Sequence, residues 1–290
     1  MTFRTRFAPS PTGPLHLGHA YSAIVAHDMA QANDGAFLLR IEDIDQSRSR
    51  DFWETQIYED LAWLGLTWDE DVIRQSDRLL VYKSALEAVW QRGLLFPCHC
   101  SRRDIAEAMS APQESTTSMG PDGPIYPGTC RHRAPKRPDA PLPDDTALRL
   151  FMSRALDALG PNPELAFHEG LHDRNHIVKI ATDALKASVG DVVLARKDMG
   201  TSYHLSVVLD DAAQDITDVV RGEDLYDATQ IHVLLQRLLG LPTPRYHHHI
   251  LIRDNAGKRL AKRDDARAIR TYRDDGASPD DIRRLVGLPP

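Results

Sequence analysis

Long apolar runs are missing from this 290-residue chain. No stretch approaches the ~20 apolar residues that a membrane-spanning helix needs, and the first eleven residues lack the apolar segment of a secretory signal. Cysteine is scarce too, and the odd number of three cysteines argues against a disulfide framework. These absences exclude a membrane protein and a disulfide-stabilised secreted domain, and they predict a cytoplasmic protein. We also find no internal repeat.

Basic residues are fewer than acidic ones, and the formal net charge is −7. The overall charge therefore gives no indication of nucleic-acid binding. Two stretches differ from the rest: residues 131–137 hold four Lys or Arg and no acid, and residues 253–273 hold eight Lys or Arg against three Asp. Local basic patches suit a protein that contacts a polyanion over a limited surface. Ordinary solvated surface charge is the alternative.

The chain begins with a pattern typical of a βαβ unit. Residues 3–7 alternate between apolar and charged, as a strand does, and apolar residues then recur at helical spacing from Leu17 until Asn33-Asp34-Gly35. Residues 36–41 (AFLLRI) form a compact apolar run that is typical of a buried parallel strand. The order strand, helix, strand predicts an α/β protein with a Rossmann-like sheet.

Further elements are predicted downstream. Helices are expected at 51–64 and 77–92, whereas the proline-rich residues 109–145 have no periodicity and are interpreted as an irregular insertion. Apolar runs return from Asp191 and are interpreted as the second half of the sheet. Ser278, followed by proline and two acidic residues, predicts a short C-terminal helix.

These changes of character divide the chain into four predicted parts. They are residues 1–97, the first half of the Rossmann-like domain; residues 98–190, an insertion; residues 191–240, the second half of that domain; and residues 241–290, a loop followed by a short helical segment.

The three cysteines bracket the insertion. Cys98 and Cys100 open it, and Cys130 closes its first part. Three thiolates around a segment without a hydrophobic core suit a structural zinc ion, one per chain, that organises the fold. Candidates for the fourth ligand are His99, His132 and Tyr126. Buried free thiols are the alternative interpretation.

His16 and His19 stand where the loop after the first strand turns into a helix. Such a loop presents backbone N–H groups and a positive dipole end to an anion, and Gly18 lets a ring approach the backbone closely. A zinc pair would need a third ligand and a base, neither of which is evident, and no GxxxxGK[ST] loop occurs. The pattern thus indicates a grip on phosphate, with ordinary helix surface as the alternative.

Four motifs in order carry a family resemblance: RFAPSPTGPLHLGHA, FLLRIEDID, DVVRGEDL and KRLAKR. Together they resemble the catalytic domain of the glutamyl-tRNA synthetases, which are class I aminoacyl-tRNA synthetases, over most of residues 3–265. The resemblance implies a Rossmann-like class I catalytic domain that takes ATP with Mg²⁺ as substrate. It implies catalytic roles for His16, His19 and Lys262, which would bind ATP together with Gly18.

The last motif departs from the family. Relatives are expected to carry Lys-Met-Ser-Lys-Ser or Lys-Leu-Ser-Lys-Arg, whereas this chain has Arg-Leu-Ala-Lys-Arg from Arg259 to Arg263. Lys262 matches the lysine that meets the phosphates. Ala261 removes a hydroxyl, and Arg259 replaces the first lysine. The charge that neutralises departing pyrophosphate is retained.

A glutamate-binding site must hold two carboxylates and one ammonium group. Arginines suit the carboxylates, and an acid suits the ammonium group. Positions that match the family's glutamate site are Arg6, Phe7, Ala8, Pro9, Ser10, Glu42, Tyr203 and Arg221. Here Arg6 and Arg221 would pair with carboxylates, Glu42 with the amino group, and Tyr203 would complete the pocket. A surface ion pair between Arg221 and Glu223 is the alternative.

The cysteine pattern and the 27 residues after Arg263 resemble the glutamyl-queuosine tRNA(Asp) synthetases, a family without an anticodon-binding domain. This resemblance selects Tyr126 as the fourth zinc ligand. It implies activation of L-glutamate by ATP and transfer to the queuosine diol of tRNA(Asp). We also expect the protein to be a monomer. The alternatives are a small enzyme that charges the 3′ end of tRNA(Glu), an inactive paralogue that only binds RNA or a protein, and a small-molecule nucleotidyltransferase.

Overall fold

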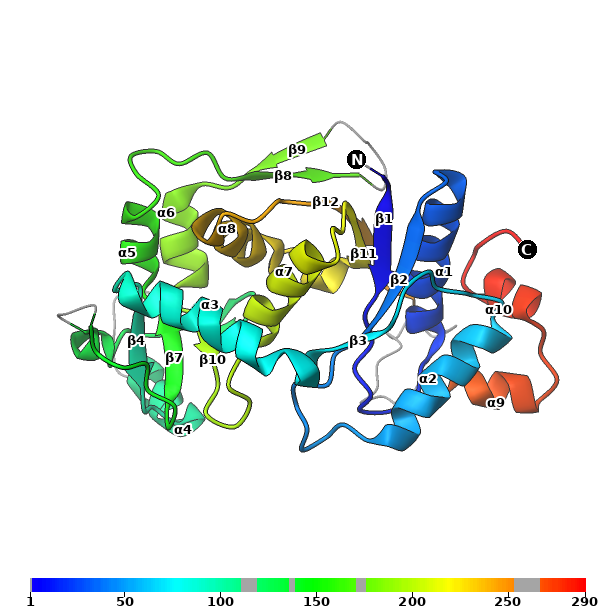
Figure 1. Ribbon diagram of the computed structural model, residues 1–290, viewed down its shortest axis with the longest axis horizontal. Coiled ribbons are helices and arrows are strands. Elements are labelled where there is room, and N and C mark those ends of the chain that lie inside the picture. The colour runs from blue at the N-terminus through cyan, green and yellow to red at the C-terminus, as the bar shows by residue number, and fades with distance from the viewer. Residues whose placement is uncertain (1, 111–118, 136–138, 171–175, 253–266) are drawn as a thin grey trace.

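The first elements of the chain form a parallel βαβ unit, as predicted (Figure 1). The computed structural model describes residues 2–110, 119–135, 139–170, 176–252 and 267–290. The unit consists of β1 (Arg4–Phe7), α1 (Leu17–Ala32) and β2 (Ala36–Ile41). The turn before β2 requires a glycine, because a Cβ at Gly35 would lie 2.3 Å from the carbonyl oxygen of Phe3.

The central sheet extends to both sides of this unit. β2 pairs in parallel with β3 (Ile73–Arg74). On the other side, the Thr217 N–H donates to the Arg4 carbonyl oxygen over 3.0 Å and brings β11 next to β1. β11 pairs in parallel with β12, β12 with β8, and β8 antiparallel with β9. These strands are β8 (Ala166–Glu169), β9 (His176–Lys179), β11 (Asp218–Gly222) and β12 (Arg245–His249).

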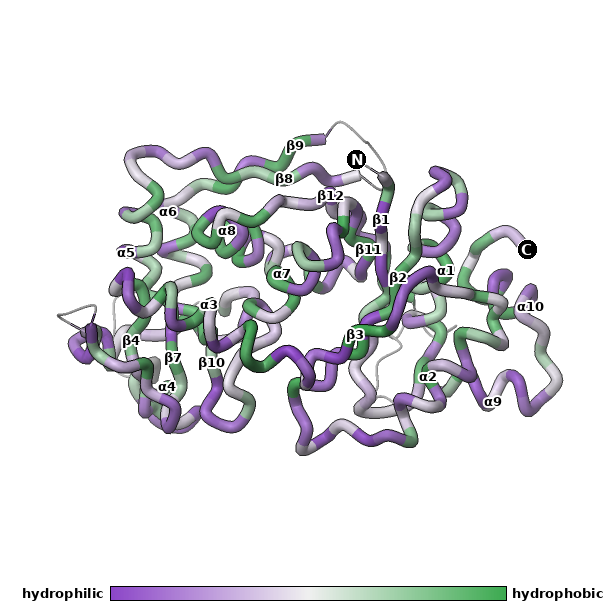
Figure 2. Tube along the Cα trace, in the orientation of Figure 1, coloured by the Kyte–Doolittle hydropathy of each residue, from purple (hydrophilic) through white to green (hydrophobic). Residues whose placement is uncertain are grey.

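β2 is buried on both faces, and its side chains alternate between two cores. Phe37, Leu39 and Ile41 pack with α1 and its neighbours, whereas Leu38 packs with the second core around α7 (Tyr203–Ala213) and α8 (Thr229–Leu239). Figure 2 shows the hydrophobic residues along the inner strands and the mostly hydrophilic outer loops. Arg40 points to the same side as Leu38 and is fully buried. The predicted buried strand is confirmed, but it carries a charged residue into the interior.

Helices cover the sheet and its ends. They are α2 (Asp51–Trp63), α3 (Leu79–Gln91), α7 (Tyr203–Ala213), α8 (Thr229–Leu239), α9 (Ile269–Asp274) and α10 (Pro279–Leu285), with 3₁₀ turns at Gln75–Arg78 and Glu223–Leu225. The helices predicted at 51–64 and 77–92 are therefore confirmed, the second beginning as a 3₁₀ turn. The predicted C-terminal helix is confirmed as well, because the Ser278 side chain caps α10. In the described part of the chain, no helix is long and apolar enough to cross a membrane.

The insertion builds a separate antiparallel sheet in the order β10, β7, β4 (Figure 1). Its described elements are β4 (Leu95–Cys98), α4 (Arg102–Ser110), β5 (Met119–Gly120), β6 (Gly123–Pro124), a 3₁₀ turn at Arg131–Arg133, β7 (Ala147–Leu150), α5 (Met152–Asp157), α6 (Thr182–Ala184), a π turn at Leu185–Val189 and β10 (Val193–Ala195).

One expectation about the sheet is wrong. The apolar run from Asp191 was expected in the second half of the central sheet, but β10 pairs with β7 of the insertion. Of the runs that follow it, residues 203–213 form helix α7 and only 218–222 form a central strand. The physical reason is that an apolar run indicates that a segment is buried but does not indicate which strand it pairs with.

Candidate active site

A large open cleft of about 1160 Å³ lies where the chain leaves β1, β2 and β11. Ligands of open α/β sheets bind at this edge, where the carboxyl ends of parallel strands meet. The predicted site residues that line it are Arg6, Phe7, Ala8, Pro9, Ser10, His16, Gly18, His19, Glu42, Cys100, Tyr126, Tyr203 and Arg221. The loop after β1 is fastened to the end of β2, because the Glu42 N–H donates to the Pro9 carbonyl oxygen over 3.0 Å.

The two signature histidines cap the start of α1. His16 Nδ1 accepts from the Gly18 N–H over 3.1 Å, and His19 Nδ1 accepts from the His16 N–H over 3.2 Å. Their rings stack with centroids 3.8 Å apart. Gly18 gives the His16 ring this space, because a Cβ there would come within 3.1 Å of it.

The caps determine how both imidazoles face the cleft. A ring nitrogen that accepts a hydrogen bond carries no proton, so Nε2 is the protonated nitrogen of each neutral ring. Each histidine therefore presents an Nε2–H donor beside the positive end of α1. This arrangement suits negatively charged oxygen atoms such as those of phosphate.

Lys262 and its motif lie outside the described residues, together with Arg259, Ala261 and most of the basic stretch 253–273. The chain on both sides of that segment is described and lies at the cleft. Ile252 lines the cleft, and Ala268 forms a backbone bridge with His16.

Beneath the cleft lies a buried ionic network centred on Arg40. Arg40 Nη1 donates to Asp211 over 2.8 Å, and Nη2 donates to Glu42 over 3.1 Å. Arg6 Nε donates to the same Asp211 oxygen over 3.0 Å. Burial raises the pKa of Glu42 against the opposing charge of Arg40, whereas Arg6 and Arg40 outweigh burial and lower the pKa of Asp211.

Asp210 closes the network from α7. Its carboxylate lies 3.9 Å from Arg40 Nε and accepts hydrogen bonds from Arg78, Gln75 and Tyr82. The connected groups are thus three arginines (Arg6, Arg40, Arg78) and three carboxylates (Glu42, Asp210, Asp211). This part of the site is balanced in charge before any substrate binds.

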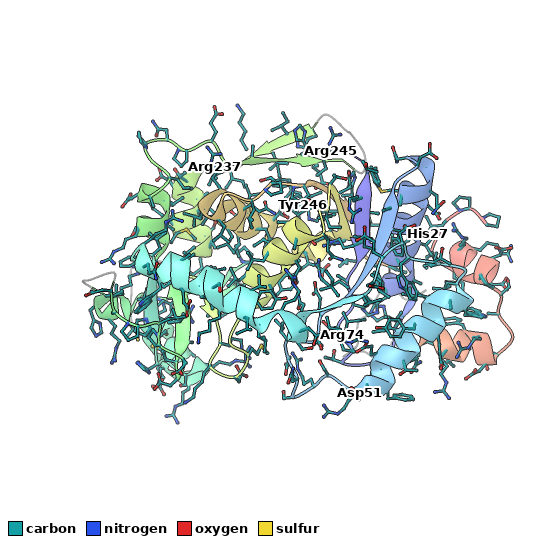
Figure 3. The ribbon with its side chains drawn as sticks, viewed as in Figure 1. His27, Asp51, Arg74, Arg237, Arg245 and Tyr246 are labelled. Carbon is teal, nitrogen blue, oxygen red and sulfur yellow. The ribbon has the colours of Figure 1, made fainter. Side chains whose placement is uncertain are left out.

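Arg221 stands apart from that network and is only 6% exposed. Its Nε donates to His248 over 3.1 Å, its Nη1 lies 3.0 Å from His232 Nδ1, and its Nη2 donates to Thr229 over 2.7 Å. The Tyr246 ring, labelled in Figure 3, lies 4.9 Å from the guanidinium carbon. The alternative of a surface ion pair with Glu223 is wrong, because Arg221 is buried and none of its contacts within the described residues is a carboxylate.

Several groups of the site were missed by sequence reasoning. They are Arg40, Asp210, Asp211, His204, His232, His248 and Glu169. The only available signal was charge inside apolar runs, as in AFLLRI and SVVLDD. The three consecutive histidines of β12 gave no strand signal, because histidine is not a typical strand residue.

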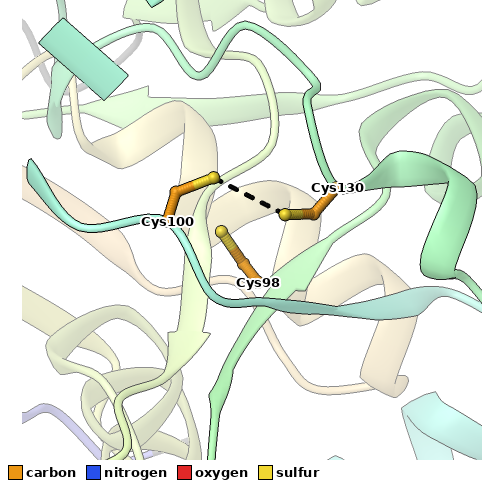
Figure 4. A group of neighbouring side chains, drawn as sticks. All are labelled: Cys98, Cys100 and Cys130. Carbon is orange, nitrogen blue, oxygen red and sulfur yellow. Dashed lines mark hydrogen bonds between the residues drawn. The ribbon is translucent and has the colours of Figure 1, made fainter. Parts of the chain in front are cut away.

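The three cysteines come together (Figure 4), and Cys100 lines the cleft. Their sulfur atoms all lie within 4.8 Å of one another, and those of Cys100 and Cys130 are 3.5 Å apart. In a tetrahedral zinc site with Zn–S distances of 2.3 Å, sulfur atoms stand ~3.8 Å apart. The spacing and the thiol donors therefore fit a zinc ion.

Tyr126 is the candidate fourth ligand that lies on this cluster. Its Oη is 3.4 Å from Cys98 Sγ and 3.5 Å from Cys100 Sγ, and it accepts the Cys130 N–H over 2.8 Å. The other candidates are engaged elsewhere, since His99 Nδ1 lies 3.3 Å from the Thr146 hydroxyl and His132 Nδ1 lies 3.0 Å from the Thr129 carbonyl oxygen.

Arg149 supplies positive charge to the cluster. Its guanidinium carbon lies 4.0 Å from the centre of the Tyr126 ring, and its Nε donates to Cys98 Sγ over 3.4 Å. Burial raises the pKa of Cys100 to about 11, but at Cys130 the hydrogen bonds from Tyr126 and the backbone outweigh burial and lower the pKa to about 7. The positive charge of Arg149 can therefore stabilise a thiolate in this cysteine cluster.

Comparison with known proteins places the chain among tRNA synthetases. The family model described as tRNA synthetases class I (E and Q), catalytic domain, matches residues 2–288. A protein of Rhodobacter capsulatus named glutamyl-Q tRNA(Asp) synthetase is 63% identical over 98% of this chain and 99% of its own length. The protein of that name in Methylococcus capsulatus is 40% identical over 99% of this chain and 83% of its own length.

Solved structures share the fold. A glutamate tRNA ligase from Elizabethkingia meningosepticum in complex with its amino acid is 25% identical and superposes with a TM-score of 0.75. The match covers 99% of this chain but 61% of that protein. A Mycobacterium tuberculosis methionyl-tRNA synthetase, 12% identical with a TM-score of 0.59, agrees in fold alone.

Proposed function

The chain belongs to the class I tRNA synthetases (E and Q), and on this premise we propose that it activates L-glutamate with ATP and transfers it to the queuosine of tRNA(Asp). One observation carries the proposal. A single cleft holds the Nε2–H donors of the signature histidines together with Arg221, a buried cation without a carboxylate partner among the described residues. Anionic oxygen atoms of two kinds, phosphate and carboxylate, suit these two places.

Each predicted residue takes a role in glutamate binding. Arg6 and Arg221 bind the carboxylates, Glu42 receives the ammonium group, and the Tyr203 hydroxyl completes the pocket. The loop from Phe7 to Ser10, which lines the cleft, surrounds the amino acid with backbone groups. Because the arginines of this pocket are buried, they favour a substrate whose carboxylates can pair with their charges.

The first step is formation of glutamyl-adenylate. A carboxylate oxygen of glutamate attacks the α-phosphorus of ATP, the acyl–phosphate bond forms, and the bond to pyrophosphate breaks. Negative charge that develops on the phosphate oxygens is stabilised by His16 and His19 through Nε2–H, and Mg²⁺ accompanies ATP as part of the substrate. Lys262 neutralises the departing pyrophosphate.

The second step transfers the glutamyl group. A hydroxyl of the queuosine cyclopentenediol attacks the acyl carbon and releases its proton, an ester forms, and AMP leaves with the bonding electrons. A cis-diol on a base resembles the ribose diol at a tRNA 3′ end, so the same chemistry serves both acceptors. The names of the similar proteins favour the queuosine acceptor over the alternative of charging tRNA(Glu). The acceptor RNA is held through its phosphates by local basic stretches, of which Arg131, Arg133, Arg267, Arg270 and Arg273 are described.

Two assays test the proposal. Exchange of pyrophosphate into ATP is expected to depend on L-glutamate and to need no tRNA. Labelled glutamate is expected to enter total tRNA from cells that make queuosine and not tRNA from cells that lack it. Absence of exchange would indicate the inactive paralogue, and exchange without glutamate would indicate a different nucleotidyltransferase.

Zinc is proposed as a structural ion held by Cys98, Cys100, Tyr126 and Cys130. Metal analysis is expected to find about one zinc per chain, and Cys98→Ser or Cys130→Ser is expected to lose it and lower the unfolding temperature, because the insertion then loses its organising ion. Tyr126→Phe is expected to weaken zinc retention, with His132→Ala as the control that keeps it. A folded, active and metal-free protein would contradict the zinc assignment.

Lys262→Ala is expected to reduce the rate of adenylate formation strongly and the affinity for glutamate only slightly. Its charge matters most as pyrophosphate forms, so kcat falls more than KM rises. Steady-state exchange kinetics at varied glutamate measure both. Ala261→Ser, which restores the family's hydroxyl, is the matched control and is expected to be neutral or mildly activating. Equal effects on kcat and KM would contradict this role.

The remaining predictions concern the whole protein. We propose a monomer that acts in the cytoplasm, where its tRNA substrate is used. The division into residues 1–97, 98–190, 191–240 and 241–290 stays a prediction, with 1–97 and 191–240 as the halves of the catalytic domain and 98–190 as the zinc-binding insertion.

A further inference from the structure

Arg221 is held by neutral acceptors, and two carboxylates lie behind the imidazole rings of this site. His248 stands between Arg221 and Glu169, with its Nδ1 2.5 Å from the Glu169 carboxylate. His232 stands on the other side, and its Nε2 lies 3.1 Å from His204 Nδ1. His204 Nε2 in turn lies 3.4 Å from an Asp122 oxygen in the turn between β5 and β6.

The protonation of this chain of groups follows from Arg221. A guanidinium donates and never accepts, so His232 Nδ1 and His248 Nε2 must be unprotonated. The remaining protons then lie on His232 Nε2, which donates to His204, and on His248 Nδ1, which donates to Glu169. Burial, followed by the charge of Arg221, holds the pKa of His232 well below its usual value. Both histidines that touch Arg221 are therefore neutral.

The neutrality of His232 and His248 matters because it leaves the charge of Arg221 without compensation. The network of Arg6, Arg40 and Arg78 is already matched by three carboxylates. Arg221 is left as a buried positive charge with no counter-ion among the described residues. A buried unpaired charge is unfavourable, and a substrate carboxylate relieves it.

The side-chain carboxylate of glutamate is the group that fits. The α-carboxylate reacts with the phosphorus and loses its charge, so it is no lasting counter-ion. Glutamine has the same shape but carries an amide at that place. The amide leaves Arg221 without a counter-ion.

We propose that His232 and His248 form a neutral cradle that keeps the charge of Arg221 uncompensated and thereby makes the pocket select glutamate over glutamine. The proposal rests on the proposed function and deepens it, since it assigns specificity to residues that contact the arginine rather than the substrate. His232 and His248 are positioning residues in this sense. His204 and Asp122 fix the tautomer of His232 from the far side.

A matched pair of variants at His232 tests the cradle. Asn and Asp have nearly the same shape and both place an oxygen near the position of Nδ1, and only Asp brings a negative charge. His232→Asn is expected to lower activity several-fold at most and to keep the preference for glutamate. His232→Asp gives Arg221 a counter-ion, and the ratio of kcat/KM for glutamate to that for glutamine in pyrophosphate exchange is expected to fall by about 10²-fold or more, the scale of a lost charged contact in a closed site.

The possible outcomes distinguish a failure of the cradle proposal from a failure of the proposed function. If the unchanged protein does not activate glutamate, the proposed function fails whatever the variants do. If it does, and His232→Asp keeps the ratio or His232→Asn loses it to the same degree, the cradle is wrong. A measurement on the unchanged protein remains decisive even where a variant does not fold. The ¹⁵N resonances of His232 are expected to show an unprotonated Nδ1 at neutral pH, and an imidazolium pattern would overturn the proposal.

Discussion

Removal of the 3′-terminal nucleotides from queuosine-containing tRNA(Asp) is expected to leave glutamate acceptance intact, whereas the same tRNA with guanosine in place of queuosine is expected to accept none. The hydroxyl that attacks the acyl carbon belongs to the queuosine diol, so the loss without queuosine is complete. The isolated anticodon stem-loop is expected to be a substrate too. Acid-precipitable labelled glutamate measures all three acceptors.

Periodate gives the control for this experiment. It cleaves the diol of queuosine and the diol of the terminal ribose alike, so it is expected to abolish acceptance in intact and trimmed tRNA. Acceptance is also expected to fall as salt rises, because an acidic protein relies on a few phosphate contacts. Loss of acceptance on trimming alone would identify a small enzyme that charges a 3′ end.

His16→Ala and His19→Ala are each expected to lower glutamate-dependent pyrophosphate exchange by about 10²-fold or more. Each change removes an imidazole that lines the cleft and that we propose donates from Nε2 to the phosphate oxygens, and donors of this kind have effects of this size. The reduction is expected in kcat, because the donors act on the transition state. Full activity of both variants would contradict the phosphate grip.

The cap at α1 calls for a separate control, because His16→Ala also removes a helix cap worth about 1 kcal/mol. His16→Asn keeps a good capping side chain but has no imidazole, so it is expected to keep the unfolding temperature and still lose exchange activity. His27→Ala, on the same helix but away from the residues that line the cleft, is expected to keep exchange activity. A normal rate in His16→Asn would mean that the ring acts only as a cap.

The sequence was most informative where local signals suffice. Residues 3–41 could be assigned because an alternating strand, a helix of regular spacing, a turn and an apolar strand stand in immediate succession. The motifs around His16 and Arg221 led to the cleft because each lies beside a strand that ends there.

Other features depend on contacts between distant segments. Arg40 and Asp211 are in contact but 171 positions apart in the sequence, and His204 and His232 are 28 positions apart. No local sequence pattern therefore predicts either pair. β10 joined the insertion sheet for a similar reason, because its apolar residues fit either sheet and only its pairing with β7 decides.

The backbone bridge between His16 and Ala268 has a consequence for Lys262. Lys262 stands six residues before Ala268 in the sequence, so the length of the intervening chain limits its distance from that anchored residue to roughly 22 Å. An amine confined in this way has an effective concentration on the order of millimolar or higher near the signature histidines. The proposed contact of this lysine with ATP would therefore form within one molecule, at a local concentration that does not depend on how dilute the enzyme is.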